Sequence, residues 1–229
     1  MPKHMIPLRE FLASLPLFAP LDAGALERLA SGMSAVDAPK GMVIVRRGEP
    51  CLGLHVVVFG SVKLSLQTPR GHEKVIDLVG RGESFGESAM FLGRPYRISA
   101  AALSDSKLLH LPRSLVVAEI DRDPTFAQRI IHGLCKRFSH LLGDVEGCTL
   151  RSGTQRVSAY LLEHLPEPAK DEGTAVTFPA QKGVIASQLN LTQEHFSRIL
   201  HELIAAGLIE VQGRVVRVLD GAGLRSRAA

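Results

Sequence analysis

The first pattern along the chain is a series of short β-branched segments between Lys40 and Leu111, separated by glycines. The glycines recur every seven to twelve residues, which is typical of the turns in a small antiparallel barrel or roll. Within this region Val62, Leu64 and Leu66 alternate with polar residues, so we expect them to share one face of a strand. A hairpin turn is predicted at Pro69-Arg70-Gly71.

A second pattern begins at Asp123-Pro124, where Asp can cap a helix and Pro suits the first helical position. Apolar residues then recur at alternating spacings of three and four, the heptad pattern of a helix-helix seam. The long helix over 123–150 either lies along its own roll or pairs with a second copy. We favour a homodimer, because three glycines weaken the isolated helix by about 1 kcal/mol each relative to Ala. The seam residues are Ile131, Leu134, Phe138, Leu141 and Val145.

The third pattern, over 151–229, predicts a winged helix-turn-helix. A short helix over Lys182–Leu189 ends at Asn190, which tolerates the left-handed backbone of a tight turn. Thr192 can cap the following helix, and a hairpin after Gly207 supplies the wing. The exposed start of the second helix has the donors and acceptors that read base edges in the major groove of double-stranded DNA. We assign DNA contact to Thr192, Gln193, Glu194, His195, Ser197 and Arg198.

Composition adds limits to these patterns. At 229 residues the chain is long enough for two domains, and no apolar run is long enough to span a membrane, so we expect a cytoplasmic protein. Three cysteines without a CxxC spacing favour neither disulfides nor a zinc site. The net charge of +4 is weak evidence for a nucleic-acid partner, because residues 151–229 hold nine basic and eight acidic side chains.

The sequence does not favour an enzyme. Small barrels also host metal-dependent oxygenases, but these need clustered His and carboxylate ligands at a spacing that does not occur here. We also find no Gly-rich phosphate loop, nucleophile elbow or paired acid-base set.

Taken together, these features resemble the Crp/Fnr family of bacterial transcription regulators over essentially the whole chain. The segments 85–93 (FGESAMFLG) and 191–198 (LTQEHFSR) carry the likeness, which is greatest to the nitric-oxide-responsive Dnr/NnrR regulators. The resemblance implies an α+β fold with a cyclic-nucleotide-binding-type β-roll (1–122), a dimerisation helix (123–150) and a winged helix-turn-helix (151–229). It also implies TTGAT-like half-sites read by Glu194, Ser197 and Arg198, with RNA polymerase as a partner.

The effector is left open by the resemblance. In cyclic-AMP-binding members, Gly and Glu at the positions of Gly86 and Glu87 hold the ribose, and an Arg-Ser pair holds the phosphate. Here Ile98 follows Arg97, and Ser99 comes one position late, which turns it to the opposite face of a strand. The positions that present Thr and Ser to adenine fall on Leu141 and Leu142. We therefore expect an apolar pocket, to which Ser88 also belongs.

The resemblance to Dnr implies haem, which an apolar pocket with one His could hold and which would sense nitric oxide or another small gas; cyclic AMP (cAMP) is the alternative. An iron-sulfur cluster is disfavoured because no cysteine precedes Cys51. The sequence does not choose a haem ligand among the histidines in or beside the sensor region, which are His55, His72, His110, His132 and His140.

Overall fold

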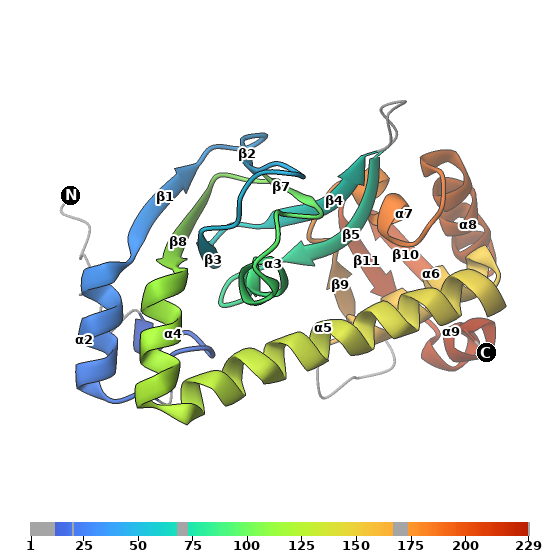
Figure 1. Cartoon of the computed structure of the whole chain (residues 1–229). Coiled ribbons are helices and arrows are strands. Elements are labelled where there is room, and N and C mark those ends of the chain that lie inside the picture. The colour runs from blue at the N-terminus through green and yellow to red at the C-terminus, as the bar shows by residue number, and fades with distance from the viewer. Residues whose placement is uncertain (1–11, 20, 68–72, 167–173, 229) are drawn as a thin grey trace, which may run out of the picture. The chain divides into compact units, whose positions relative to one another are not determined.

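The computed structural model describes residues 12–19, 21–67, 73–166 and 174–228 (Figure 1). The chain divides into two compact units, Met1–Phe138 and Ser139–Ala229, and each is described here by itself. The mixture of a β-roll, a long helix and a helical C-terminal unit confirms the predicted α+β fold. Within the described ranges, no helix is both long and apolar enough to cross a membrane.

Two four-stranded antiparallel sheets form the roll of the first unit (Figure 1). One sheet has the strand order β1-β8-β3-β6, and the other has the order β2-β7-β4-β5. The inward side chains of both sheets form an apolar core that includes Val57, Val62, Val79 and Phe85. The strands are β1 (Ser34–Ala38), β2 (Val43–Val45), β3 (Gly53–Phe59), β4 (Val62–Gln67), β5 (Glu73–Val79), β6 (Ser84–Phe85), β7 (Ser99–Ala102) and β8 (Ser106–Pro112).

The predicted alternation in β4 holds only for its first half. Val62 and Leu64 are buried, but a register shift between Leu64 and Ser65 turns Ser65 inward and leaves Leu66 half-buried. Leu64 pairs with Asp77 and Ser65 with Val75, so Ile76 of β5 is the extra residue of a bulge, and the regular pleat of the β4–β5 pair is interrupted at this point. The predicted turn at Pro69-Arg70-Gly71 lies outside the described residues.

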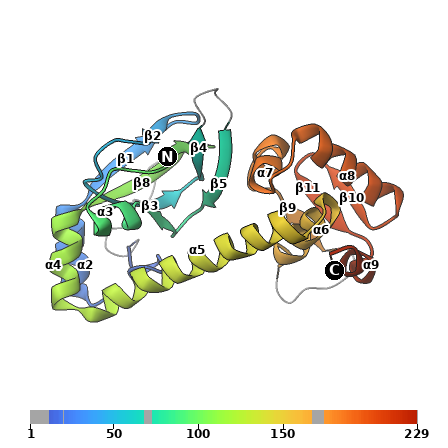
Figure 2. The ribbon, with the colours of Figure 1, turned by 45° about the vertical axis from the view of Figure 1, so that its right-hand side comes forward.

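Two short helices lie side by side at one end of the roll, as Figures 1 and 2 show: α2 (Ala23–Gly32) and α4 (Arg113–Arg122). A buried ionic contact joins them. The side chain of Glu119 on α4 is fully buried and accepts hydrogen bonds from Nε and Nη2 of Arg28 on α2. Arg122 adds a second cation at 3.7 Å, so the buried carboxylate is well compensated.

The long helix α5 (Pro124–Leu150) begins at the predicted residue. The carboxylate of Asp123 accepts hydrogen bonds from the backbone N and the hydroxyl of Thr125. These bonds stabilise the anion and lower the pKa of Asp123. Within the first unit, Phe126 and Ile130 are buried in the core beside α2 and β3, so one face of α5 packs on the roll.

The second unit is a winged helix-turn-helix (Figure 2). Its apolar core contains Val157, Phe178, Ile185, Phe196 and Leu200. The three-stranded antiparallel sheet has the order β10-β11-β9, so the wing hairpin is extended by one strand from before the helix pair. The elements are α6 (Gly153–Glu163), β9 (Ala175–Thr177), α7 (Lys182–Gln188), α8 (Gln193–Ala205), β10 (Ile209–Gln212), β11 (Val215–Val218) and α9 (Gly221–Ala228).

Candidate DNA-binding face and effector site

The turn between α7 and α8 has the predicted geometry. Asn190 has φ 57°, in the left-handed region, and is the only non-glycine with positive φ in the described ranges. Thr192 caps α8, because its Oγ1 accepts a hydrogen bond from the backbone N of His195 at 3.2 Å. The inner face of α8 buries Phe196, Ile199, Leu200 and Leu203, so the direction of its outer face is fixed by the core.

The outer face of α8 exposes Glu194 and Arg198 one turn apart. Arg198 lies 4.0 Å from Glu202, a loose pair in which both side chains are more than half exposed. Such a pair contributes little to stability and can be exchanged for another partner. Ser197 is half-buried beside them. The arrangement leaves one acid and one strong donor available to base edges or phosphates.

Two predicted DNA-contact residues, Gln193 and His195, have side chains that lie against neighbouring helices of the same unit. The His195 side chain is half-buried, and a Cβ atom at Gly153 would lie 3.3 Å from its Cε1, so the ring packs against the first turn of α6. A Cβ atom at Gly183 would lie 2.7 Å from Oε1 of Gln193, which places this amide over α7. Gln193 is exposed and can still turn towards a ligand, whereas His195 is held by its packing.

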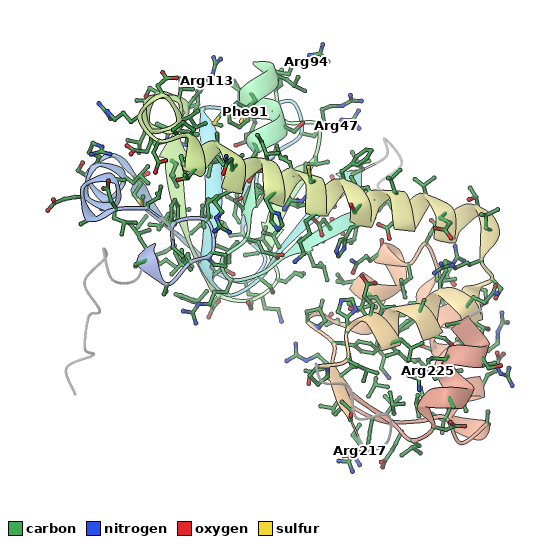
Figure 3. All side chains as sticks on the ribbon, turned by 90° about the horizontal axis from the view of Figure 1, so that it is seen from below. Arg47, Phe91, Arg94, Arg113, Arg217 and Arg225 are labelled. Atoms are coloured by element: carbon green, nitrogen blue, oxygen red, sulfur yellow. The ribbon has the colours of Figure 1, made fainter. Side chains whose placement is uncertain are left out.

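Exposed arginines occur on both units. Figure 3 shows Arg47, Arg94 and Arg113 pointing outward from the first unit, and Arg217 pointing outward from the second. Basic side chains alone therefore do not identify the DNA-binding face, as the balanced charge of residues 151–229 already indicates.

In the roll, Gly86 and Glu87 adopt a special local geometry. Gly86 has φ 103° and precedes helix α3 (Glu87–Leu92), and a Cβ atom there would lie 3.1 Å from the backbone O of Gly53. Both the backbone angle and the close approach require glycine. Glu87 is buried, whereas its predicted neighbour Ser88 is exposed.

The buried Glu87 carboxylate belongs to an ionic cluster that the sequence analysis missed. Arg137 of α5 lies 3.6 Å from Glu87, donates a hydrogen bond from Nε to Asp77 of β5 at 2.8 Å, and donates one from Nη2 to the backbone O of Ser84 at 2.7 Å. We call Asp77, Ser84, Glu87 and Arg137 the Arg137 cluster. Two carboxylates and a guanidinium make the surroundings of Glu87 polar, whereas the sequence analysis expected an apolar pocket; the pocket itself stays a prediction.

The other predicted effector residues are not part of the Arg137 cluster. Arg97 is exposed, and the hydroxyl of Ser99 accepts a hydrogen bond from the backbone N of Arg47 at 3.1 Å. Leu141 and Leu142 belong to the second unit, and both are exposed. Their role in binding an effector stays a prediction.

Of the candidate haem ligands, His55 is the most deeply buried among the described residues. Its ring stacks on Phe85 with centroids 5.0 Å apart and contacts His110 at 4.8 Å, while its Nδ1 has no hydrogen-bond partner. Burial, with a smaller contribution from His110, lowers the pKa of His55 to about 4. His132 and His140 are exposed, and His72 lies outside the described residues.

The seam predicted on α5 is largely open to solvent. The exposed fractions of Ile131, Phe138, Leu141 and Val145 are 56, 62, 38 and 62% of each residue's surface, an unusual density of exposed apolar residues. Leu134 differs, because it packs against the apolar core of the roll. Helix α5 therefore has one face on its own roll and an exposed apolar face, so the two sequence-based alternatives are not exclusive.

Comparisons with known proteins agree with both units. Residues 35–123 match the cyclic nucleotide-binding domain, and residues 155–227 match the Crp-like helix-turn-helix domain. A CRP-like cAMP-activated global transcriptional regulator of Mycobacterium tuberculosis is 24% identical and covers 96% of this chain and 99% of its own length. A Ruegeria pomeroyi protein named as a cyclic nucleotide binding protein has a structure with 30% identity, 96% coverage of each chain and a TM-score of 0.60. FixK2 from Bradyrhizobium japonicum shares the fold, with a TM-score of 0.75, 21% identity and coverage of 86% of this chain and 98% of its own.

Proposed function

Because this chain belongs to the Crp/Fnr family of transcription regulators, we propose that it is a dimeric regulator that binds double-stranded DNA through α8 and responds to a small effector. The observation that carries the DNA-binding part is the outer face of α8. It presents Glu194, Ser197 and Arg198 at the start of a helix whose opposite face is held by the core. Contact with RNA polymerase stays a prediction from the family resemblance.

The test of this face is the binding of fluorescent duplexes that contain an inverted TTGAT-type repeat or a scrambled sequence. Arg198→Ala should weaken binding to the specific duplex by about 1–3 kcal/mol and leave the scrambled duplex almost unaffected. Arg94→Ala removes an exposed arginine from the first unit and serves as the matched control (Figure 3). An equal loss on both duplexes would show that Arg198 contacts only phosphate.

The exposed face of α5 supports a second copy of the chain as the dimer partner. A strip of four large apolar residues at heptad spacing is covered most simply by the same strip from a parallel helix. Phe138→Glu places a charge in this seam without touching the core, so it should convert the dimer into a folded monomer in analytical ultracentrifugation. It should also abolish cooperative binding to half-sites about one helical turn apart. A Phe138→Glu dimer of unchanged stability would refute the seam.

The Arg137 cluster supports a polar effector of the cyclic-nucleotide type. A ligand that enters the roll near Glu87 meets carboxylates and a guanidinium, which bind hydroxyl, amino and phosphate groups better than an apolar macrocycle. The match of residues 35–123 to the cyclic nucleotide-binding domain supports the same class.

Haem remains a second candidate, because His55 fits the chemistry of an iron ligand. Its imidazole is neutral near pH 7, and its unpartnered Nδ1 is available to a metal. The nitric-oxide sensing implied by the resemblance to Dnr/NnrR depends on this candidate. Haem titration should then produce a Soret band that His55→Phe removes and His132→Phe keeps. No Soret band in the unmodified protein would end the haem hypothesis.

A further inference from the structure

Packing within the first unit decides which side of helix α5 faces the roll. Ile130 is buried in the apolar core of this unit, and Leu134 packs against the same core. Arg137, three residues further, donates hydrogen bonds to Asp77 and to the backbone O of Ser84. Spacings of four and three keep Ile130, Leu134 and Arg137 on one side of a helix. This side is therefore already occupied by the protein's own roll.

The exposed side of α5 differs from the seam that the sequence predicts. Ile131 and Phe138 belong to both, because each is more than half exposed. Between them the predicted seam uses Leu134, which packs on the roll, whereas the neighbouring Cys135 is exposed. Cys135 lies four residues after Ile131 and three before Phe138, which is again a heptad spacing. Cys135 therefore takes the place of Leu134 in the exposed strip.

The same change of one position recurs two turns further along α5. Leu142 is the more exposed of two adjacent leucines, with 54% of its surface open against 38% for Leu141. One residue turns a side chain by about 100° around the helix axis, so the strip cannot follow both leucines equally. The exposed heptad positions are therefore Ile131, Cys135, Phe138, Leu142 and Val145.

We propose that the dimer seam has this register and that Cys135 faces Cys135 of a second copy of the chain. The proposal rests on the dimer of the proposed function and fixes the residues in contact. In a parallel pair of helices with two-fold symmetry, each seam position lies against the same position of the other helix. Packed helix axes are about 8–10 Å apart and each Cα lies about 2.3 Å from its axis, so facing Cα atoms approach within about 6 Å, as a disulfide requires.

The two registers differ in the cysteine that they place in the seam. The spacing predicted from the sequence continues from Val145 by three residues to Cys148 and leaves Cys135 beside the seam. The register proposed from the structure includes Cys135 and continues from Val145 by four residues to Thr149. Disulfide formation between native cysteines of two copies therefore distinguishes the registers.

The test is oxidation of the purified protein by diamide, followed by non-reducing gel electrophoresis. Two thiols transfer their hydrogens to the azo bond of diamide, which becomes a hydrazine, and one S–S bond forms. The wild type should give a covalent dimer that Cys135→Ser removes and that Cys51→Ser and Cys148→Ser keep. It should form about tenfold or more faster than in the monomeric Phe138→Glu at equal concentration, because facing thiols have a high effective concentration.

A second pair of variants tests the register away from the native thiol. In the Cys135→Ser background, Leu142→Cys should restore the covalent dimer and Leu141→Cys should not. The register would be overturned by a covalent dimer that survives Cys135→Ser and is lost in Cys148→Ser, or by restoration through Leu141→Cys alone. It would also be overturned if a wild type that sediments as a dimer formed no disulfide. A reduced wild type that sediments as a monomer would overturn the proposed dimer itself, so the two failures are distinguishable.

Discussion

The two units of this protein differ in how many polar side chains they bury. Among the described residues, buried polar or charged side chains comprise five in the first unit (His55, Ser65, Glu87, Ser106 and Glu119) and Ser158 in the second. The acid and the arginine assigned to DNA contact in the second unit are exposed on α8, above an apolar core. Side chains that read DNA must be exposed, whereas polar side chains buried in a core need hydrogen-bond or ionic partners there.

This difference predicts that the first unit is the more sensitive to the loss of a single charge. Glu119→Ala removes a fully buried carboxylate with its hydrogen bonds from Arg28 and leaves a cavity between α2 and α4. The free energy of unfolding of the first unit should fall by about 3 kcal/mol. Chemical denaturation followed by a probe in each unit measures the effect, which should spare the second unit.

Asp37→Ala is the control for this prediction, because Asp37 is 80% exposed and lies 3.7 Å from Lys107. Its loss should cost less than about 1 kcal/mol. Equal effects of the two substitutions would mean that the buried contact of Glu119 contributes no more than a surface pair.

The second prediction concerns pH and again separates the units. The pKa of His55 is lowered to about 4 in the folded protein, against 6.5 for an unperturbed histidine, so the unfolded state gains the proton first as pH falls. Its contribution to stability is therefore fully present above pH 6.5 and is lost between pH 6.5 and about 4. At pH 5 the loss is about 2 kcal/mol.

The measurement is the unfolding free energy of the wild type and His55→Phe at several pH values, with Phe chosen because the ring stacks on Phe85. The difference between the two proteins should grow as pH falls below 6.5. The second unit should show no such difference. A constant difference across this range would show that His55 is not buried in its neutral form.

The smallest expected effect lies in the second unit, where backbone geometry replaces buried charge as the sensitive feature. Asn190→Ala forces a Cβ-bearing residue without a polar side chain to keep φ near 57°, which should cost about 1 kcal/mol. Asn190→Gly should be neutral or slightly stabilising. Thermal unfolding of both variants checks this, and equal melting temperatures would show that the turn relaxes to another conformation.

The sequence predicted the helix-turn-helix unit more completely than the β-roll unit. The caps, the left-handed Asn190 and the apolar face of α8 are local features, and local signals are enough when each element has one buried side. Even there, the half-buried position of His195 depends on Gly153 at the start of α6, which no spacing within α8 reveals.

The β-roll unit depends on contacts between residues far apart in the sequence, which no local pattern indicates. Asp77 and Arg137 are separated by 60 residues, and nothing in either neighbourhood indicates the pairing. The one available signal was an aspartate in step with Val79 on the strand, which breaks an otherwise apolar inward face. The alternation of apolar and polar residues likewise does not predict the register shift after Leu64 or the burial of Ser65.

The sequence by itself determined the order of the elements, the family and the residues on the outer face of α8, because periodicity and capping act within a few residues of each other. Only the tertiary structure decided which side of α5 faces the roll, which carboxylates Arg137 joins and how His55 is buried. These outcomes depend on groups that approach from distant strands and helices, and their free energies come from burial and charge pairing, which exist only after the chain has folded.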